Sequence, residues 1–225
     1  MSDINPTSRA VDLSAYKALE QMQLKPSPED GQRAEIKDTF QRSTGQEPPP
    51  NLLPVPDTRQ SVDYSCGAAS LQAVLMYYGD EYMESSLMEM LGTTTNGTNP
   101  KDIVRVAEDL GYTAELKENL TIEDLENSVK KGIPVIVDGQ AWRDGDDLNL
   151  PWSNVWESGH YMVVIGTDKK NVYLEDPSML GSRGIIPREE FLERWHDYDD
   201  KKYYNMGIFI AGKEPNPPKP LMHVD

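Results

Sequence analysis

Two proline-rich runs bound the part of this 225-residue chain that can fold into a compact unit. Residues 48–56 (PPPNLLPVP) hold five of the 17 prolines, and residues 215–220 (PNPPKP) hold four more. Proline has no N–H to donate to a helix or a sheet, so such runs favour extended chain that links or straps folded parts. We therefore predict an N-terminal arm at 1–53, one folded domain at 54–212 and a proline-rich tail at 213–225.

The N-terminal arm carries one amphipathic helix pattern, at 11–24. A charged segment at 29–42 is also compatible with a helix, but it has only two large apolar residues. We expect a loosely held, partly helical arm. A role as a cover for a cleft is the alternative.

Inside the domain, helical patterns come first and strand patterns follow. Ser65 precedes a long apolar run that Gly79 ends, Asn99-Pro100 begins a second pattern, and Thr121 with Asp124 can cap a third. These signals predict helices over 66–78, 100–110 and 121–131, strands over 133–137, 160–166, 172–176 and 207–211, and a short helix opening at Pro187. A helical half followed by a strand-rich half is typical of an α+β fold with a largely antiparallel sheet.

Charge and composition exclude several classes of function. Lys and Arg total 22 against 38 Asp and Glu, so the net charge of −16 argues against binding to nucleic acid or to anionic membranes. It leaves basic peptides or proteins as ligands. No stretch approaches 18 consecutive apolar residues and the first 16 residues show no signal-peptide pattern, so we expect a cytoplasmic protein without membrane insertion.

Cofactor chemistry is not indicated either. A single cysteine excludes a disulfide framework and any Cys-rich metal centre, and the three histidines stand at no familiar metal-ligand spacing. We expect no metal and no cofactor.

The single cysteine, Cys66, lies at the first turn of a predicted buried helix, in the sequence DYSCGAAS. The N–H groups of a helix start have no intrahelical partners and the helix dipole is positive there, so both favour a thiolate. The small residues that follow let a substrate chain approach closely. The alternative from position alone is that Cys66 is a small buried apolar residue.

One histidine stands where it could activate that thiol. His223 lies in the proline-rich tail, and His196 lies at the end of a short amphipathic helix, where a surface role is expected. His160 instead opens the most apolar strand of the chain, so its ring is expected at the end of the sheet, beside a cleft. An adjacent imidazole is the usual means of activating a cysteine nucleophile.

A carboxylate for that histidine follows from strand pairing. We expect the strand that His160 opens to form a hairpin with the next strand, with Gly166 opposite Val172. In this register Asp176 lies diagonally across from His160 on the same face of the sheet, within reach of its ring. A slip by one residue would put Glu175 there instead. Asp176 can therefore orient the imidazole.

An oxyanion donor can be placed six residues before the cysteine. Gln60 stands on the extended chain that leads into the helix of Cys66, where its side-chain amide can turn toward a developing oxyanion beside the backbone N–H of Cys66.

Three motifs in this order resemble peptidase family C39, a family of papain-like cysteine peptidases best known as the leader-removing domains of bacteriocin-exporting transporters. They are Gln60 with DYSCGAA at 63–69, GHYMVVIG at 159–166, and VYLEDPS at 172–178. The resemblance covers about 54–212 and implies a papain-like fold in which the helix of Cys66 packs on an antiparallel sheet carrying His160 and Asp176. It further implies Cys66 as nucleophile, His160 as general base and then acid, Asp176 as orienting residue and Gln60 as oxyanion donor.

A long segment separates the predicted strand at 133–137 from His160. Residues 139–158 carry three of the four tryptophans, two of which, Trp142 and Trp156, we predict to bind substrate at the rim of the cleft. An aromatic lid that packs on itself is the alternative. The acidic run within the segment lacks the ligand spacing of a calcium loop.

The sequence therefore predicts a cysteine peptidase acting on a peptide or protein substrate. Two alternatives stay open at this point: a peptide-binding module that does not cut, and an enzyme of acyl transfer or deamidation that uses the same residues. The oligomeric state and the identity of the substrate do not follow from the sequence.

Overall fold

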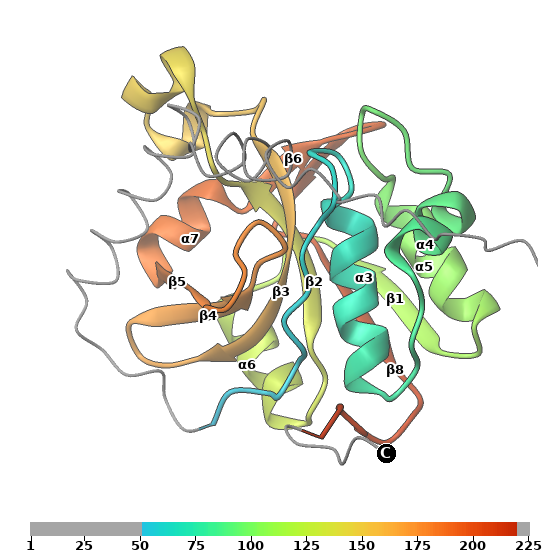
Figure 1. The fold of residues 1–225 in the computed structure, drawn as a ribbon. Helices are drawn as coiled ribbons and strands as arrows, with labels where there is room; N and C mark the ends of the chain where they lie inside the picture. Colours follow the sequence, from blue (N-terminus) through green and yellow to red (C-terminus); the bar gives the residue numbers. More distant parts are fainter. Residues whose placement is uncertain (1–50, 220–225) are drawn as a thin grey trace, which may run out of the picture. The chain divides into compact units, whose positions relative to one another are not determined.

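The computed structural model describes residues 51–219, which form an α+β unit built on a six-stranded antiparallel sheet (Figure 1). The elements in chain order are α3 (Cys66–Tyr77), α4 (Glu84–Leu91), α5 (Pro100–Asp109), β1 (Thr113–Lys117), α6 (Ile122–Lys130), β2 (Val135–Gln140), η1 (Gly145–Asn149), η2 (Trp152–Asn154), β3 (Gly159–Thr167), β4 (Asn171–Glu175), β5 (Gly184–Pro187), α7 (Arg188–Arg194), β6 (His196–Tyr198), β7 (Lys202–Tyr204) and β8 (Gly207–Ala211). The strand order is β1-β8-β2-β3-β4-β5, and β6 and β7 form a separate pair. The predicted α+β class with an antiparallel sheet is confirmed.

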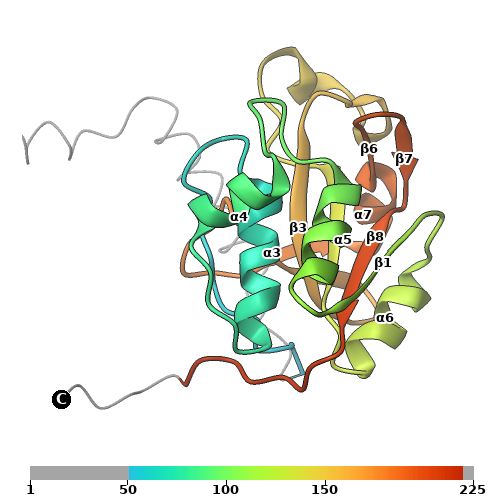
Figure 2. The ribbon, with the colours of Figure 1, turned by 90° about the vertical axis from the view of Figure 1, so that its right-hand side faces the viewer.

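Helices cover both faces of the sheet (Figures 1 and 2). One face packs against α3, α4 and α5, and the buried residues there include Val163 and Ile165 of β3. The other face packs against α6 and α7, and it buries Met162 and Val164. Because side chains alternate along a strand, β3 serves two cores, which explains why it is the most apolar strand of the chain.

The predicted helix boundaries hold closely, with one correction. Helix α3 ends at Tyr77, and Gly79 follows with a φ of 91°, a left-handed conformation that favours glycine. The expected side-chain cap by Ser65 is wrong: its hydroxyl donates instead to the carbonyl oxygen of Val62, at 2.9 Å. That bond closes a turn in front of the helix and so fixes how the chain enters it.

The next two helices begin with the predicted caps. The side chain of Asn99 accepts the N–H of Lys101 at the start of α5. Thr121 and Asp124 form a reciprocal capping box at the start of α6.

Several short elements have weak sequence signals and were not predicted. They are α4, β1, β5, β6 and β7. In addition, β2 begins two residues later than expected and runs to Gln140, so the polar residues after the apolar run are still part of the sheet. His196 is also not a surface residue, because it lies buried in β6 and its Nε2 is 2.9 Å from the carbonyl oxygen of Val155.

A β-bulge modifies the predicted hairpin of β3 and β4. Near the end of β4 the register is as expected, with Val163 opposite Glu175. At the turn, however, Gly166 pairs with Tyr173 rather than with Val172, because Ile165 is an extra residue in β3. The bulge therefore leaves the part of the register that places Asp176 unchanged.

The predicted helices of the N-terminal arm and His223 of the tail lie outside the described residues. Within residues 51–219, no helix is long and apolar enough to cross a membrane.

Candidate active site

Cys66 is the first residue of α3 and is buried, with 7% of its surface exposed. The helix start packs tightly against its neighbours: a Cβ atom built on Gly67 would lie 2.9 Å from the Cβ of Thr98 and 3.2 Å from the ring of Tyr161. Glycine is therefore required at this position. The close approach brings the thiol of Cys66 up to the start of β3.

His160 and Asp176 meet as the register predicts. The Nε2 atom of His160, on β3, lies 2.7 Å from Oδ1 of Asp176, which directly follows β4. The same oxygen accepts the N–H of Ser178, at 2.8 Å, so a tight turn after β4 fixes the carboxylate. Because Nε2 is engaged by Asp176, Nδ1 is the ring nitrogen that remains for Cys66.

The electrostatics of the three groups favour a thiolate beside an imidazolium. Burial raises the pKa of the Cys66 thiol, but the hydrogen bond and charge of His160 and the N–H groups of Tyr161 and Gly67 lower it more, so the net pKa lies below its usual value of 9.0. Burial lowers the pKa of His160, but Asp176 and Cys66 raise it to about 10. Burial raises the pKa of Asp176, and the charge of His160 with three hydrogen bonds brings it below 3.8.

Gln60 lies on the chain that enters α3 and contacts both sides of the site. Its Nε2 donates to the carbonyl oxygens of Val62 (3.1 Å) and Asp63 (3.3 Å), in the loop before Cys66. Its Oε1 accepts the hydroxyl of Ser178, at 3.2 Å. The amide is thus held between the loop of the nucleophile and the turn that fixes Asp176.

Trp142 belongs to the site through a contact that the sequence did not indicate. Its Nε1 donates to Oδ2 of Asp176, at 3.0 Å, so the two carboxylate oxygens of Asp176 have different partners. The backbone of Trp142 has a φ of 56°, which is unusual for a residue other than glycine and turns the chain so that the indole faces the triad.

Trp156 lies elsewhere, against the pair of strands β6 and β7. Its ring packs on His196, with centroids 4.4 Å apart, and on Tyr204, at 5.8 Å. The ammonium of Lys202 lies over the same ring, 4.1 Å from its centroid. Trp142 and Trp156 thus contact different parts of the domain, Asp176 and the β6–β7 pair, and substrate binding by the two stays a prediction.

Two buried ionisable groups near the triad were missed. Burial and the charges of Asp197 and Cys66 raise the pKa of Asp138 well above its usual range, so the neutral acid is favoured. A carboxyl group at the end of an apolar strand, IPVIVDG, was the available signal. Arg194 on α7 is the second: burial lowers the pKa of its guanidinium, and the charges of Glu190 and Asp176 only partly oppose this.

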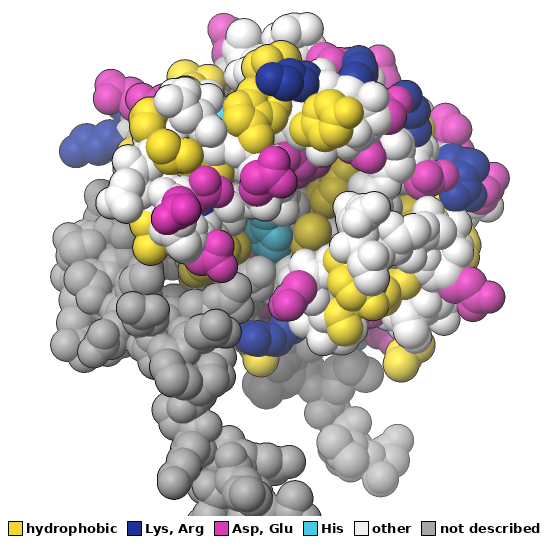
Figure 3. All heavy atoms as spheres, turned by 90° about the horizontal axis from the view of Figure 1, so that it is seen from above, with side chains coloured by type: hydrophobic (Ala, Val, Ile, Leu, Met, Phe, Trp, Pro, Cys, Tyr) yellow, Lys and Arg dark blue, Asp and Glu magenta, His cyan; other side chains and the backbone are white. Residues whose placement is uncertain are grey.

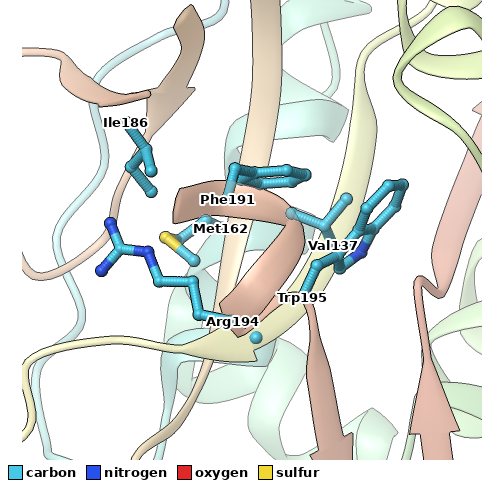
Figure 4. A pocket seen from close by; sticks show the side chains of 7 residues that line it. Val137, Met162, Ile186, Phe191, Arg194 and Trp195 are labelled. Atoms are coloured by element: carbon cyan, nitrogen blue, oxygen red, sulfur yellow. The ribbon is translucent and has the colours of Figure 1, made fainter. Parts of the chain in front are cut away.

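Arg194 also closes the space beneath the site. Figure 4 shows its side chain lying along the hollow between α7 and the sheet, with Met162 and Ile186 at the same end and Phe191 and Trp195 across from them. The hollow is so well filled that it leaves no room for a water molecule. The side of β3 that faces α7 is therefore tightly packed.

The site opens at the end of the molecule where α3 and β3 begin. Figure 3 shows a hollow there, with a histidine side chain on its floor and several acidic side chains around its rim. Within residues 51–219, no group of three His, Cys, Asp or Glu side chains is arranged to hold a metal ion.

Comparison with known proteins gives a consistent assignment. The sequence profile described as "Peptidase C39 family" matches residues 55–198. The chain is 34% identical over 143 residues to the transport/processing ATP-binding protein ComA of Streptococcus pneumoniae, a match that covers 61% of this chain and 17% of ComA. The chain thus spans less than a fifth of the length of this curated relative.

Two solved structures share the fold at 23% sequence identity. The peptidase domain of Streptococcus ComA, described as a bi-functional ABC transporter involved in a quorum-sensing pathway, superposes with a TM-score of 0.53 over 69% of this chain and 97% of that domain. A double glycine motif protease from an AMS/PCAT transporter, in complex with its leader peptide, gives a TM-score of 0.51 over 74% of this chain and 96% of the other.

Proposed function

Because the chain belongs to the peptidase C39 family, a family of cysteine peptidases, we propose that it hydrolyses a peptide bond with Cys66 as nucleophile, His160 as general base and acid, and Asp176 as the residue that orients the imidazole. The observation that carries the proposal is the row formed by the three groups, in which the thiol faces an imidazole whose other nitrogen is 2.7 Å from a buried carboxylate. A cysteine kept only for packing would need neither partner.

The chemistry follows from the ion pair. The thiolate of Cys66 attacks the carbonyl carbon of the scissile peptide, and the carbonyl oxygen becomes an oxyanion. His160, protonated up to a pKa of about 10, then gives its Nδ1 proton to the leaving amine. Water, deprotonated by the now neutral imidazole, attacks the thioester and releases the carboxylic acid product and the free thiol.

Gln60 is the second donor that we assign to the oxyanion, beside the backbone N–H of Cys66. Its Nε2 donates to the carbonyl oxygens of the loop that precedes Cys66, so this role requires the amide to rotate and direct one N–H toward the substrate. The position between that loop and Ser178 supports this role. Loss of one such donor typically costs about 10²–10³ in kcat.

The similar protease solved with its leader peptide suggests one class of substrate to test. We therefore include peptides with a double-glycine motif among the first substrates to test.

The experiment is to incubate the full chain with a panel of such peptides and to identify the products by mass spectrometry, with C66S as the control. Turnover that C66S abolishes, with two fragments and one added water, supports the proposal. Binding of the peptide by both proteins without cleavage would instead make the domain a binding module. A product with a new amide bond or a lost amide nitrogen would make it an acyl transferase or a deamidase.

A further inference from the structure

Glu175 is a fully buried carboxyl group that the proposed chemistry does not use. It is the last residue of β4, and none of its surface is exposed. Asp176, the next residue, faces His160, so alternation along the strand turns Glu175 to the opposite face, the one covered by α3. A buried carboxyl group adjacent to a catalytic position requires a physical explanation, because removing it from water is costly.

Glu175 accepts two hydrogen bonds from Thr58. Its Oε1 accepts both the backbone N–H and the hydroxyl of Thr58, each at 2.9 Å. The same hydroxyl lies 3.1 Å from the carbonyl oxygen of Ala69, in the first turn of α3. Thr58 therefore connects the end of β4 to the helix turn that carries Cys66.

Thr58 is two residues before Gln60, and both are bound by the segment from Glu175 to Pro177 at the end of β4. Pro177, two residues after Glu175, accepts the N–H of Gln60 through its carbonyl oxygen, at 3.0 Å. The pairs Glu175–Thr58 and Pro177–Gln60 thus fix the extended chain at two points, one on each side of Arg59. These two attachments restrict movement of the Gln60 backbone along α3.

The second oxygen of the Glu175 carboxyl group, Oε2, lacks such hydrogen bonds among residues 51–219, and the nearest guanidinium nitrogen, Nη1 of Arg183, is 3.9 Å away. Burial raises the pKa of Glu175 to about 7, against the effect of Thr58 and Arg183. Burial of this carboxyl group is therefore costly, and within the described residues its polar contacts are the two hydrogen bonds from Thr58 and the more distant guanidinium of Arg183.

From this geometry we infer that Glu175 is a positioning residue that holds Gln60 in place for oxyanion stabilisation by binding Thr58. The inference rests on the proposed function, because it concerns the oxyanion donor of that reaction. Glu175 does not touch the substrate. Its effect on turnover passes through the segment from Thr58 to Gln60.

The test compares E175A, E175Q, Q60A and the double variant Q60A/E175A in steady-state cleavage of a peptide that the wild type cuts. We expect E175A to lower kcat by about tenfold, less than the loss of about 10²–10³ for removal of an oxyanion donor, because Gln60 is displaced rather than removed, and to leave KM within about twofold. E175Q keeps an oxygen acceptor for Thr58 and should retain most of the turnover. In Q60A/E175A, kcat should equal that of Q60A alone, because the two act through one group.

Alkylation of Cys66 distinguishes a positioning role of Glu175 from general disruption of the active site. The rate at which iodoacetamide alkylates Cys66 reports the Cys66–His160 pair, and E175A should leave it unchanged. E108A, which removes an exposed carboxylate on α5, serves as the matched control for both assays. Should E175A fail to fold, T58V tests the same contact, because valine keeps the shape of Thr58 without its hydroxyl.

Three results would overturn the inference while leaving the proposed function intact. They are turnover by E175A equal to that of the wild type, a loss that multiplies with that of Q60A, and a parallel loss of alkylation. A wild-type chain with no turnover that depends on Cys66 would overturn the proposed function, and this inference with it.

Discussion

Replacing Glu175 by glutamine is expected to change how the stability of the protein depends on pH, whether or not the chain cuts peptides. The native carboxyl group has a pKa of about 7, raised by burial from 4.5. Between these values the native state holds a proton that the unfolded state has lost. Stability therefore falls as the pH rises through this window and levels off above it.

The magnitude follows from the size of the shift. A change from 4.5 to about 7 is roughly 2.5 pKa units, which corresponds to about 3 kcal/mol when the group is fully ionised in both states. Since part of this change has already occurred at pH 5, the wild type should lose about 2.5 kcal/mol relative to E175Q between pH 5 and pH 8. Side chains that titrate in both proteins cancel in the difference.

Urea unfolding followed by tryptophan fluorescence measures this difference at pH 5, 6, 7 and 8. The free energy of unfolding of E175Q minus that of the wild type should increase steadily up to pH 7 and flatten beyond it. Parallel curves for the two proteins over the whole range would refute the reasoning, since they would mean that Glu175 has the same pKa in the folded and unfolded chain. E108Q, at an exposed position, should show such parallel curves.

Three further changes test the site itself. H160A removes the partner that lowers the pKa of Cys66, so alkylation by iodoacetamide at pH 6 should slow by at least about tenfold; an unchanged rate would show that the thiol is not paired. W142F keeps an aromatic ring but loses the N–H that Asp176 accepts, and kcat should fall by about fivefold, the value of one hydrogen bond; equal kcat values would limit Trp142 to packing. G67A places a Cβ 2.9 Å from Thr98 and should lower the free energy of unfolding by about 1–3 kcal/mol in urea titrations; an unchanged stability would mean that Thr98 moves aside at no cost.

Much of the fold could be predicted because its main elements carry strong local signals. The helix at Pro100 has a capping asparagine and a proline at its first turn, and the strand after His160 is continuously apolar because both of its faces are buried. Strands such as β6 have three residues and mixed polarity. Their pairing depends on distant segments, and no pattern within the strand itself shows it.

Some contacts of the candidate site could also be predicted from local sequence signals, and others could not. His160 and Asp176 could be paired from the sequence, since one hairpin register brings them together. The indole of Trp142 could not be assigned to Asp176, because that contact depends on a left-handed backbone conformation at a residue other than glycine. The role of Glu175 was hidden for another reason: in the correct register it lies on the face away from His160, and its partner Thr58 is 117 residues earlier in the chain.

The bulge in β3 provides an attachment point for the chain that leads to Gln60 and Cys66. Ile165 has no partner in β4, and its carbonyl oxygen accepts the N–H of Leu53, at 2.8 Å. The extended chain that carries Gln60 is thus bound at its beginning by the bulge and at its end by Glu175 and Pro177. Because the bulge leaves Ile165 without a partner in β4, its carbonyl oxygen can bind the chain that leads to Cys66. The deviation from the predicted register therefore supplies the anchor that the proposed oxyanion donor needs, and it does so at the far end of β3, where it leaves the pairing of His160 with Asp176 unaffected.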